Sequence, residues 1–104
     1  MPSMPQEAMA LAERLCAGER LAGDRLAATV LALALLDLAR DSRTAARLAE
    51  SAHALVLRAV TTLAAEPALL DLRARDQRTM RQHYVPTILA MKALNDFKAS
   101  NTLE

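Results

Sequence analysis

The sequence predicts an all-α protein, a small bundle of four to five helices formed by a single domain over residues 1–104. Residues with high helix propensity dominate the composition, with 23 alanines and 19 leucines. Two glycines and four prolines leave few helix breakers. No window shows sustained alternation of apolar and polar residues, so we expect no strands.

Capping residues indicate where the first two predicted helices begin and end. Residues 3–6 read as a capping box that opens the first helix. Gly18 or Gly23 would end it, and Gly23 is favoured because Asp24 can cap the next helix. The second helix runs from about Arg25 to Arg40 and is apolar on nearly all sides, which predicts that it lies at the centre of the bundle.

The polar cluster at residues 40–44 predicts a turn, and a third helix then extends to about Ala65. The prolines at 67 and 86 mark two further boundaries, because the residue before a proline is disfavoured in helical geometry. We expect a fourth helix over 67–84 and a last one from Pro86 to about Ser100; the alternative is one helix over 67–99, kinked at Pro86.

Composition also limits the function. A net charge of +1 argues against a dedicated nucleic-acid binder. The longest uncharged stretch, 26–36, is shorter than the roughly 20 residues a membrane span requires, and no signal peptide is evident. A lone cysteine, Cys16, excludes an internal disulfide and is compatible with the cytoplasm, where we expect the protein. Two widely separated histidines predict no metal site, and no motif predicts a cofactor.

Eleven of the 13 basic residues are arginines. They gather in two groups, one at positions 40, 43 and 47 and one at positions 73, 75, 78 and 81. Arginine suits bidentate pairing with carboxylates or phosphates. We interpret both groups as helix faces with interspersed ion pairs.

Residues 78–83 (RTMRQH) resemble the Arg-x4-His signature of HEPN ribonucleases, which pair such motifs across a dimer. The resemblance implies that His83 would transfer a proton while Arg78 holds a phosphate. Thr79 departs from the residue type that usually follows this arginine. The alternative is a solvated basic helix face with His83 near its end.

His53, in the run Ala52-His53-Ala54-Leu55, resembles the phosphorylated histidine of histidine phosphotransfer domains, which are helical bundles of similar size. Those domains carry a lysine and a glycine soon after the histidine, whereas Val56 and Leu57 follow here. A histidine on the flank of a helix is the alternative interpretation.

The C-terminal third resembles the tail of the XpaC family, which occurs with TelA-type tellurite-resistance proteins. The resemblance consists of Glu66-Pro67, an Arg-rich helix, the step YVPTIL at 84–89, and a last helix with Lys92 and Phe97. Val85 replaces that family's leucine. The resemblance implies a bacterial, cytoplasmic, helical accessory protein and identifies no active residue.

Taken together, these patterns predict a non-enzymatic bacterial interaction or regulatory protein that acts through helix–helix contacts; the HEPN-like ribonuclease and the phosphotransfer module remain the alternatives. Not every apolar face of the second helix can point inward in so small a bundle, and an exposed apolar face favours self-association. We therefore expect a homodimer, with a further protein partner possible and neither membrane nor nucleic acid as partners. The interface would include Val30, Leu31, Leu35 and Leu38.

Overall fold

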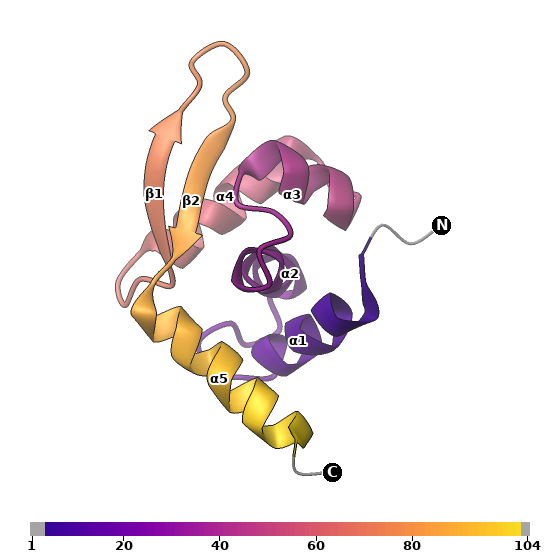
Figure 1. The fold of residues 1–104 in the computed structure, drawn as a ribbon. Helices are drawn as coiled ribbons and strands as arrows, with labels where there is room; N and C mark the ends of the chain where they lie inside the picture. The colour runs from indigo at the N-terminus through magenta and orange to yellow at the C-terminus, as the bar shows by residue number, and fades with distance from the viewer. Residues whose placement is uncertain (1–3, 103–104) are drawn as a thin grey trace.

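The computed structural model describes residues 4–102 and shows a mostly helical fold with one β-hairpin (Figure 1). In chain order the elements are α1 (Gln6–Cys16), α2 (Arg25–Leu35), α3 (Ser42–Ala49), α4 (His53–Ala64), β1 (Leu70–Arg75), β2 (Gln82–Pro86) and α5 (Ile88–Thr102). The two strands are antiparallel. The all-α prediction is therefore correct for the helices and wrong for the segment that forms the hairpin.

The centre of the fold is α2, which Figure 1 shows end-on with the other elements around it. The side chain of Asp24 caps this helix by accepting a hydrogen bond from the Ala27 amide at 3.1 Å, as the sequence predicts. Eight of its 11 residues are buried, which confirms the prediction of a central helix. They are Ala27, Ala28, Val30, Leu31, Ala32, Leu33, Ala34 and Leu35.

The ends of the first two helices differ from the prediction. Helix α1 stops at Cys16, and irregular turns lead to Gly23, which has a φ of +87°. Helix α2 stops at Leu35, because Asp37 adopts the left-handed conformation and the Leu38 amide donates back to the Leu33 carbonyl at 2.8 Å. Ser3 of the predicted capping box lies outside the described residues, and Pro5 occupies the N-cap position.

The single helix predicted up to Ala65 is two helices, α3 and α4, separated by three residues. Glu50 has a φ of 53°, and the amides of Glu50 and Ser51 donate to the carbonyls of Arg47 and Ala46. This is the Schellman pattern that ends a helix. Because Glu50 occupies the place where glycine is usual, the sequence carries no breaker at this point.

The fourth predicted helix, 67–84, is the β-hairpin, and the alternative of one kinked helix over 67–99 is also wrong. Residues 70–75 (LDLRAR) alternate apolar with polar residues, and the burial of β2 alternates as well. This alternation escaped the sequence interpretation because helix-forming Leu, Ala and Arg carry it. Tertiary pairing overrides that propensity. The last helix begins close to Pro86, as predicted.

The hydrophobic core is made mainly of alanine and leucine from α1, α2 and α4, with Tyr84 and Phe97 as its two aromatic residues. Tyr84 lies on the inner face of β2, and its hydroxyl is buried with no hydrogen-bond partner within the described residues. The hairpin and α5 each contribute one aromatic ring to this core, beside smaller buried residues such as Leu70 of β1 and Ala90 of α5.

The position of Leu33 generates the first testable prediction. Its side chain is fully buried in α2, so Leu33→Asp places an unpaired carboxylate in the core. We expect a loss of roughly 3–5 kcal/mol in the free energy of unfolding, or no folding at all. The control is Met9→Asp, at a side chain on α1 that is 51% exposed, where the loss should stay below about 1 kcal/mol. Thermal unfolding followed by circular dichroism measures both; a Leu33→Asp variant that melts within about 2 °C of wild type contradicts the prediction.

Candidate nucleic-acid interface

Helices α3 and α4 form a helix–turn–helix unit. The turn between them, residues 50–52, has the three-residue length that is typical of this motif. Asp41 caps α3 by accepting a hydrogen bond from the Thr44 amide at 2.9 Å. The second helix, α4, packs against α2 as well as against α3, so the orientation of α4 is set from two sides.

The two faces of α4 differ in chemistry. Val56, Ala59, Val60 and Leu63 are buried and recur at helical spacing. The opposite face is exposed, and it carries Ala54, Leu55, Arg58, Thr61 and Thr62. A helix with one apolar face fixed in the core and one free polar face can enter a groove of another molecule.

The β-hairpin lies beside this unit, and its turn is ordered by its own side chains. The Asp76 carboxylate accepts hydrogen bonds from the amides of Arg78 at 2.8 Å and Thr79 at 3.3 Å. These two bonds lower the pKa of Asp76. Met80 adopts the left-handed conformation, with a φ of 61°. The turn therefore presents a defined shape and exposes Arg78.

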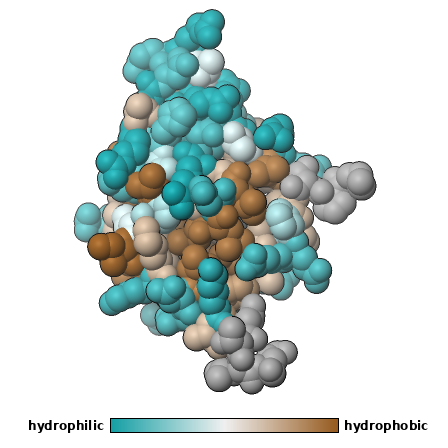
Figure 2. All heavy atoms as spheres, in the orientation of Figure 1, coloured by the Kyte–Doolittle hydropathy of each residue, from teal (hydrophilic) through white to brown (hydrophobic). Residues whose placement is uncertain are grey.

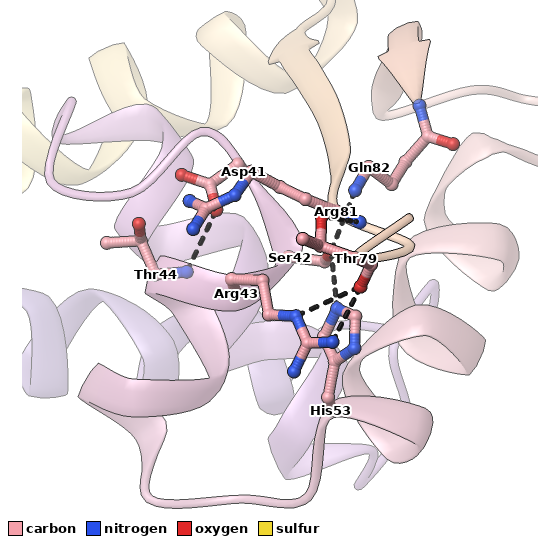
Figure 3. Close-up of polar contacts among 8 residues, drawn as sticks. All are labelled: Asp41, Ser42, Arg43, Thr44, His53, Thr79, Arg81 and Gln82. Atoms are coloured by element: carbon pink, nitrogen blue, oxygen red, sulfur yellow. Dashed lines mark hydrogen bonds and ion pairs between the residues drawn. The ribbon is translucent and has the colours of Figure 1, made fainter. Parts of the chain in front are cut away.

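Three contacts fasten the hairpin to the start of α3, and Figure 3 shows the two that are made by side chains. The Arg43 guanidinium donates two hydrogen bonds to the Thr79 carbonyl, at 2.6 and 3.1 Å. Arg81 forms an ion pair with the α3 cap Asp41 at 2.7 Å. Asp41 also forms an isolated β-bridge with His83, so it lies along β2 like a short third strand.

The buried hydroxyl of Ser42 adds further contacts between α3, α4 and the hairpin. Ser42 is fully buried, and its Oγ accepts a hydrogen bond from the Gln82 amide at 2.9 Å. The same oxygen lies 2.7 Å from Nε2 of His53, the first residue of α4. A serine hydroxyl has one hydrogen, and among the described residues this hydrogen has no other hydrogen-bond acceptor, so its donation to an unprotonated Nε2 satisfies both groups. Ser42 therefore links the first residues of α3, α4 and β2.

The surroundings of Ser42 lower the pKa values of His53 and Asp41. Burial and the positive charges of Arg43, Arg75 and Arg81 lower the pKa of His53, against a smaller opposing effect of Asp41. Burial alone would raise the pKa of Asp41, but the hydrogen bonds from Thr44 and the charge of Arg81 outweigh it and lower the value. The neutral histidine and the ionised aspartate both suit the hydrogen bonds described above.

The arginines of residues 40–83 fall into two groups. Three of them form ion pairs within the fold: Arg40 with Asp37, Arg73 with Asp71, and Arg81 with Asp41. A fourth, Arg43, donates hydrogen bonds to the Thr79 carbonyl. Within residues 4–102, no hydrogen bond or ion pair holds the side chains of Arg47, Arg58, Arg75 and Arg78. Those four exposed guanidinium groups are available to an anionic partner.

The structure places the predicted catalytic candidates differently from the helix assumed for them. Arg78 lies in the hairpin turn and His83 on β2, and both are exposed. His53 is half-buried at the start of α4 and is engaged by Ser42. The Arg-rich helix of the XpaC resemblance is likewise the hairpin, and the YVPTIL step joins β2 to α5.

The predicted interface residues lie mainly inside the chain. Val30 and Leu31 are fully buried and Leu35 is 6% exposed, all covered by the chain's own elements. Leu38 alone of the four is at the surface. In the described part of the chain, no group of His, Cys, Asp and Glu could hold a metal ion, and no helix is long and apolar enough to cross a membrane.

Sequence reasoning missed the residues that define this site, namely Ser42, Gln82 and the exposed face of α4. One signal of this site is present in the sequence, because the two arginine groups lie before and after an amphipathic helix. The groups are far apart along the chain, so the sequence does not show that both lie near His53 in the folded protein.

Protonation of His53 generates a prediction about pH. Because the pKa of His53 in the folded protein is below its ordinary value of 6.5, the unfolded chain binds more protons between these two values. Stability should therefore fall as the pH is lowered from about 7.5 to about 5.5. His53→Gln, which retains a hydrogen-bonding side chain, should lose less stability over this interval. Urea unfolding at the two pH values measures the difference, and equal losses in both proteins contradict it.

No protein-family model matches this chain, and neither a curated protein nor a solved structure does. Its function must therefore be inferred from the geometry of the site itself.

Proposed function

We propose that this protein binds double-stranded DNA as a winged helix–turn–helix, with α4 in the major groove and the hairpin turn against the neighbouring backbone. The observation that carries the proposal is the arrangement of α3, α4 and the hairpin as one connected unit with an exposed second helix. In helix–turn–helix proteins the second helix enters the major groove and the first crosses the backbone.

The exposed face of α4 offers suitable chemistry for base contacts. Arg58 can donate two hydrogen bonds to the O6 and N7 atoms of a guanine. Ala54 and Leu55, near the beginning of the helix, can contact thymine methyl groups, and Thr62 offers a hydroxyl. Base contacts come mainly from the beginning of the recognition helix in this class of motif, where Ala54 and Leu55 lie; Arg58 stands in the middle of α4 and Thr62 near its end.

Phosphate contacts would come from the free arginines around α4. Residues 40–83 contain eight arginines and five carboxylates, so this segment carries a net charge of +3 although the whole chain carries +1. Arg47 lies on α3, and Arg75 and Arg78 lie on the hairpin. Phosphate contacts of this kind supply affinity and fix the orientation of a protein on the duplex.

This proposal departs from the sequence-based expectation that nucleic acid is not a partner, since that expectation averaged the charge over the chain. It keeps the expected regulatory class, with DNA as the first partner. The ribonuclease alternative draws no support from the structure, because the exposed Arg78 and His83 lie on a hairpin rather than on one face of a helix.

DNA binding and its dependence on the hairpin arginines can be measured by fluorescence anisotropy with a short duplex of mixed sequence. We expect binding that weakens steeply between about 50 and 200 mM salt. Arg75→Ala and Arg78→Ala should each weaken binding to all sequences and reduce the salt slope by about 1. Arg14→Ala removes an arginine on α1 and should leave affinity unchanged. Absence of binding at low salt, or an equal effect of Arg14→Ala, contradicts the proposal.

Arg58 is tested by sequence preference. Selection from a pool of random duplexes should yield a preferred site for the wild type, and Arg58→Ala should lose about 1–3 kcal/mol of discrimination at one base pair. The same substitution should change affinity for unrelated sequences much less. If Arg58→Ala selects the same site with the same stringency, α4 does not read the bases through this residue.

We further propose that the protein acts as a homodimer, because helix–turn–helix proteins commonly place two copies on two half-sites. Figure 2 shows hydrophobic side chains gathered in the middle of the face where Figure 1 places the end of α2, while hydrophilic residues cover the hairpin end. Leu38, next to the end of α2, is 39% exposed, and Met91 on α5 is 44% exposed. These side chains support an apolar contact that leaves the hairpin and α4 free.

The homodimer predicts a light-scattering mass of twice the chain mass of 11.3 kDa at micromolar concentration. Leu38→Glu should shift the protein towards the monomer, because it places a charge in the contact. Leu55→Glu is the matched control, at a leucine of similar exposure (48%) on α4, and should leave the mass unchanged. A wild-type mass of one chain over the whole range contradicts this proposal.

A further inference from the structure

A hollow of about 410 Å³ lies on the side of the molecule formed by α1, the connection from α1 to α2, and α5. Its walls include the buried side chains of Leu21, Leu31, Leu69 and Phe97. The elements that supply them are far apart in the sequence, so the hollow is a product of the tertiary fold. Pockets for small organic molecules have volumes of about 300–1,000 Å³ and predominantly apolar walls, and this hollow meets both conditions.

The charged residues that line the hollow indicate the class of molecule that fits it. Two arginines, Arg14 and Arg20, and two carboxylates, Glu19 and Asp96, line it together with the apolar residues. Their charges cancel, so neither an anion nor a cation gains from net attraction, whereas entering an apolar site costs either of them solvation. An uncharged ligand avoids that cost and gains from burial against leucine and phenylalanine.

One of the lining residues connects the hollow to the end of α4. The Arg20 guanidinium donates hydrogen bonds to the carbonyls of Thr62 at 3.2 Å, Ala65 at 3.0 Å and Pro67 at 3.4 Å. Pro67 and Leu69 themselves line the hollow, and they belong to the segment that leads from α4 into β1. A molecule in the hollow thus contacts the segment that joins the helix and the hairpin proposed above to bind DNA.

We propose that this hollow is a binding site for an uncharged, mainly apolar small molecule, and that occupancy changes the DNA affinity of α4 and the hairpin. The binding site stands on the hollow alone, whereas the effect on DNA rests on the proposed function. Coupling of this kind requires that the ligand bind the DNA-bound and free forms with different affinities. A typical coupling changes affinity by roughly 5- to 150-fold.

The binding site is tested with N-phenyl-1-naphthylamine, an uncharged aromatic probe whose fluorescence rises in apolar surroundings. Ala93 lines the hollow, so Ala93→Phe fills part of it and should weaken probe binding at least about tenfold. Asn95→Phe adds the same ring at an exposed position of α5 that does not line the hollow. It should bind the probe as wild type does. Circular dichroism checks that both variants keep the helical content of the wild type.

Equal probe binding by wild type, Ala93→Phe and Asn95→Phe overturns the site, as does absence of binding to the wild type. A second copy of the chain is the other possible occupant of the hollow. If probe binding weakens as protein concentration rises, and Ala93→Phe abolishes a wild-type dimer, the hollow is a subunit contact and the proposal fails.

The effect on DNA is tested by repeating the anisotropy titration with saturating probe. The wild-type Kd for DNA should change about fivefold or more, and that of Ala93→Phe should not change. An unchanged wild-type Kd overturns the coupling. If the wild type does not bind DNA at all, the proposed function fails, and the probe titration still decides whether the hollow is a binding site.

Discussion

The hydroxyl of Ser42 is shared by three elements, and the geometry of the candidate interface depends on it. Its oxygen accepts from the backbone of β2 and contacts the imidazole at the start of α4, while Ser42 itself is the first residue of α3. A buried polar group is costly unless its hydrogen bonds are satisfied together. Displacing any one of the three elements would break at least one of these two hydrogen bonds, so the three elements hold a common orientation.

The residues on either side of Ser42 make the other contacts between α3 and the hairpin. Asp41 precedes Ser42, and it caps α3 while pairing with Arg81 next to β2. Arg43 follows Ser42 and reaches the hairpin turn at Thr79. Three consecutive residues at the start of α3 thus make every contact shown in Figure 3 between that helix and the hairpin. A short polar segment thus acts together with the buried side chains of Leu70 and Tyr84 to determine where the hairpin stands relative to α4.

Sequence patterns predicted the parts of the fold that local chemistry determines. The multi-sided apolar character of α2, the cap at Asp24 and the boundary at Pro86 were all readable. The break at Glu50 was not, because a non-glycine residue takes the left-handed conformation there under the constraint of packing α3 and α4 together. The hairpin was missed because helix-forming residues occupy its first strand, although residues 70–75 alternate in polarity. Of the candidate site, the arginine groups were evident, but their convergence on His53 depends on the strand pairing and could not be predicted without it.

Some arginines of this surface are paired within the fold, and the others are free to bind another molecule. Arg81 already has a carboxylate partner, and a phosphate that approached it would have to compete with Asp41, the cap of α3. Displacing small cations from DNA gains free energy only where a protein charge replaces them, so an arginine neutralised within the fold adds little. The effective charge of the interface is therefore closer to that of four arginines than to that of eight. In the proposed binding to DNA, a small basic surface of this kind would favour reversible association and rapid exchange between sites on a long duplex, with selectivity left to the few side chains of α4.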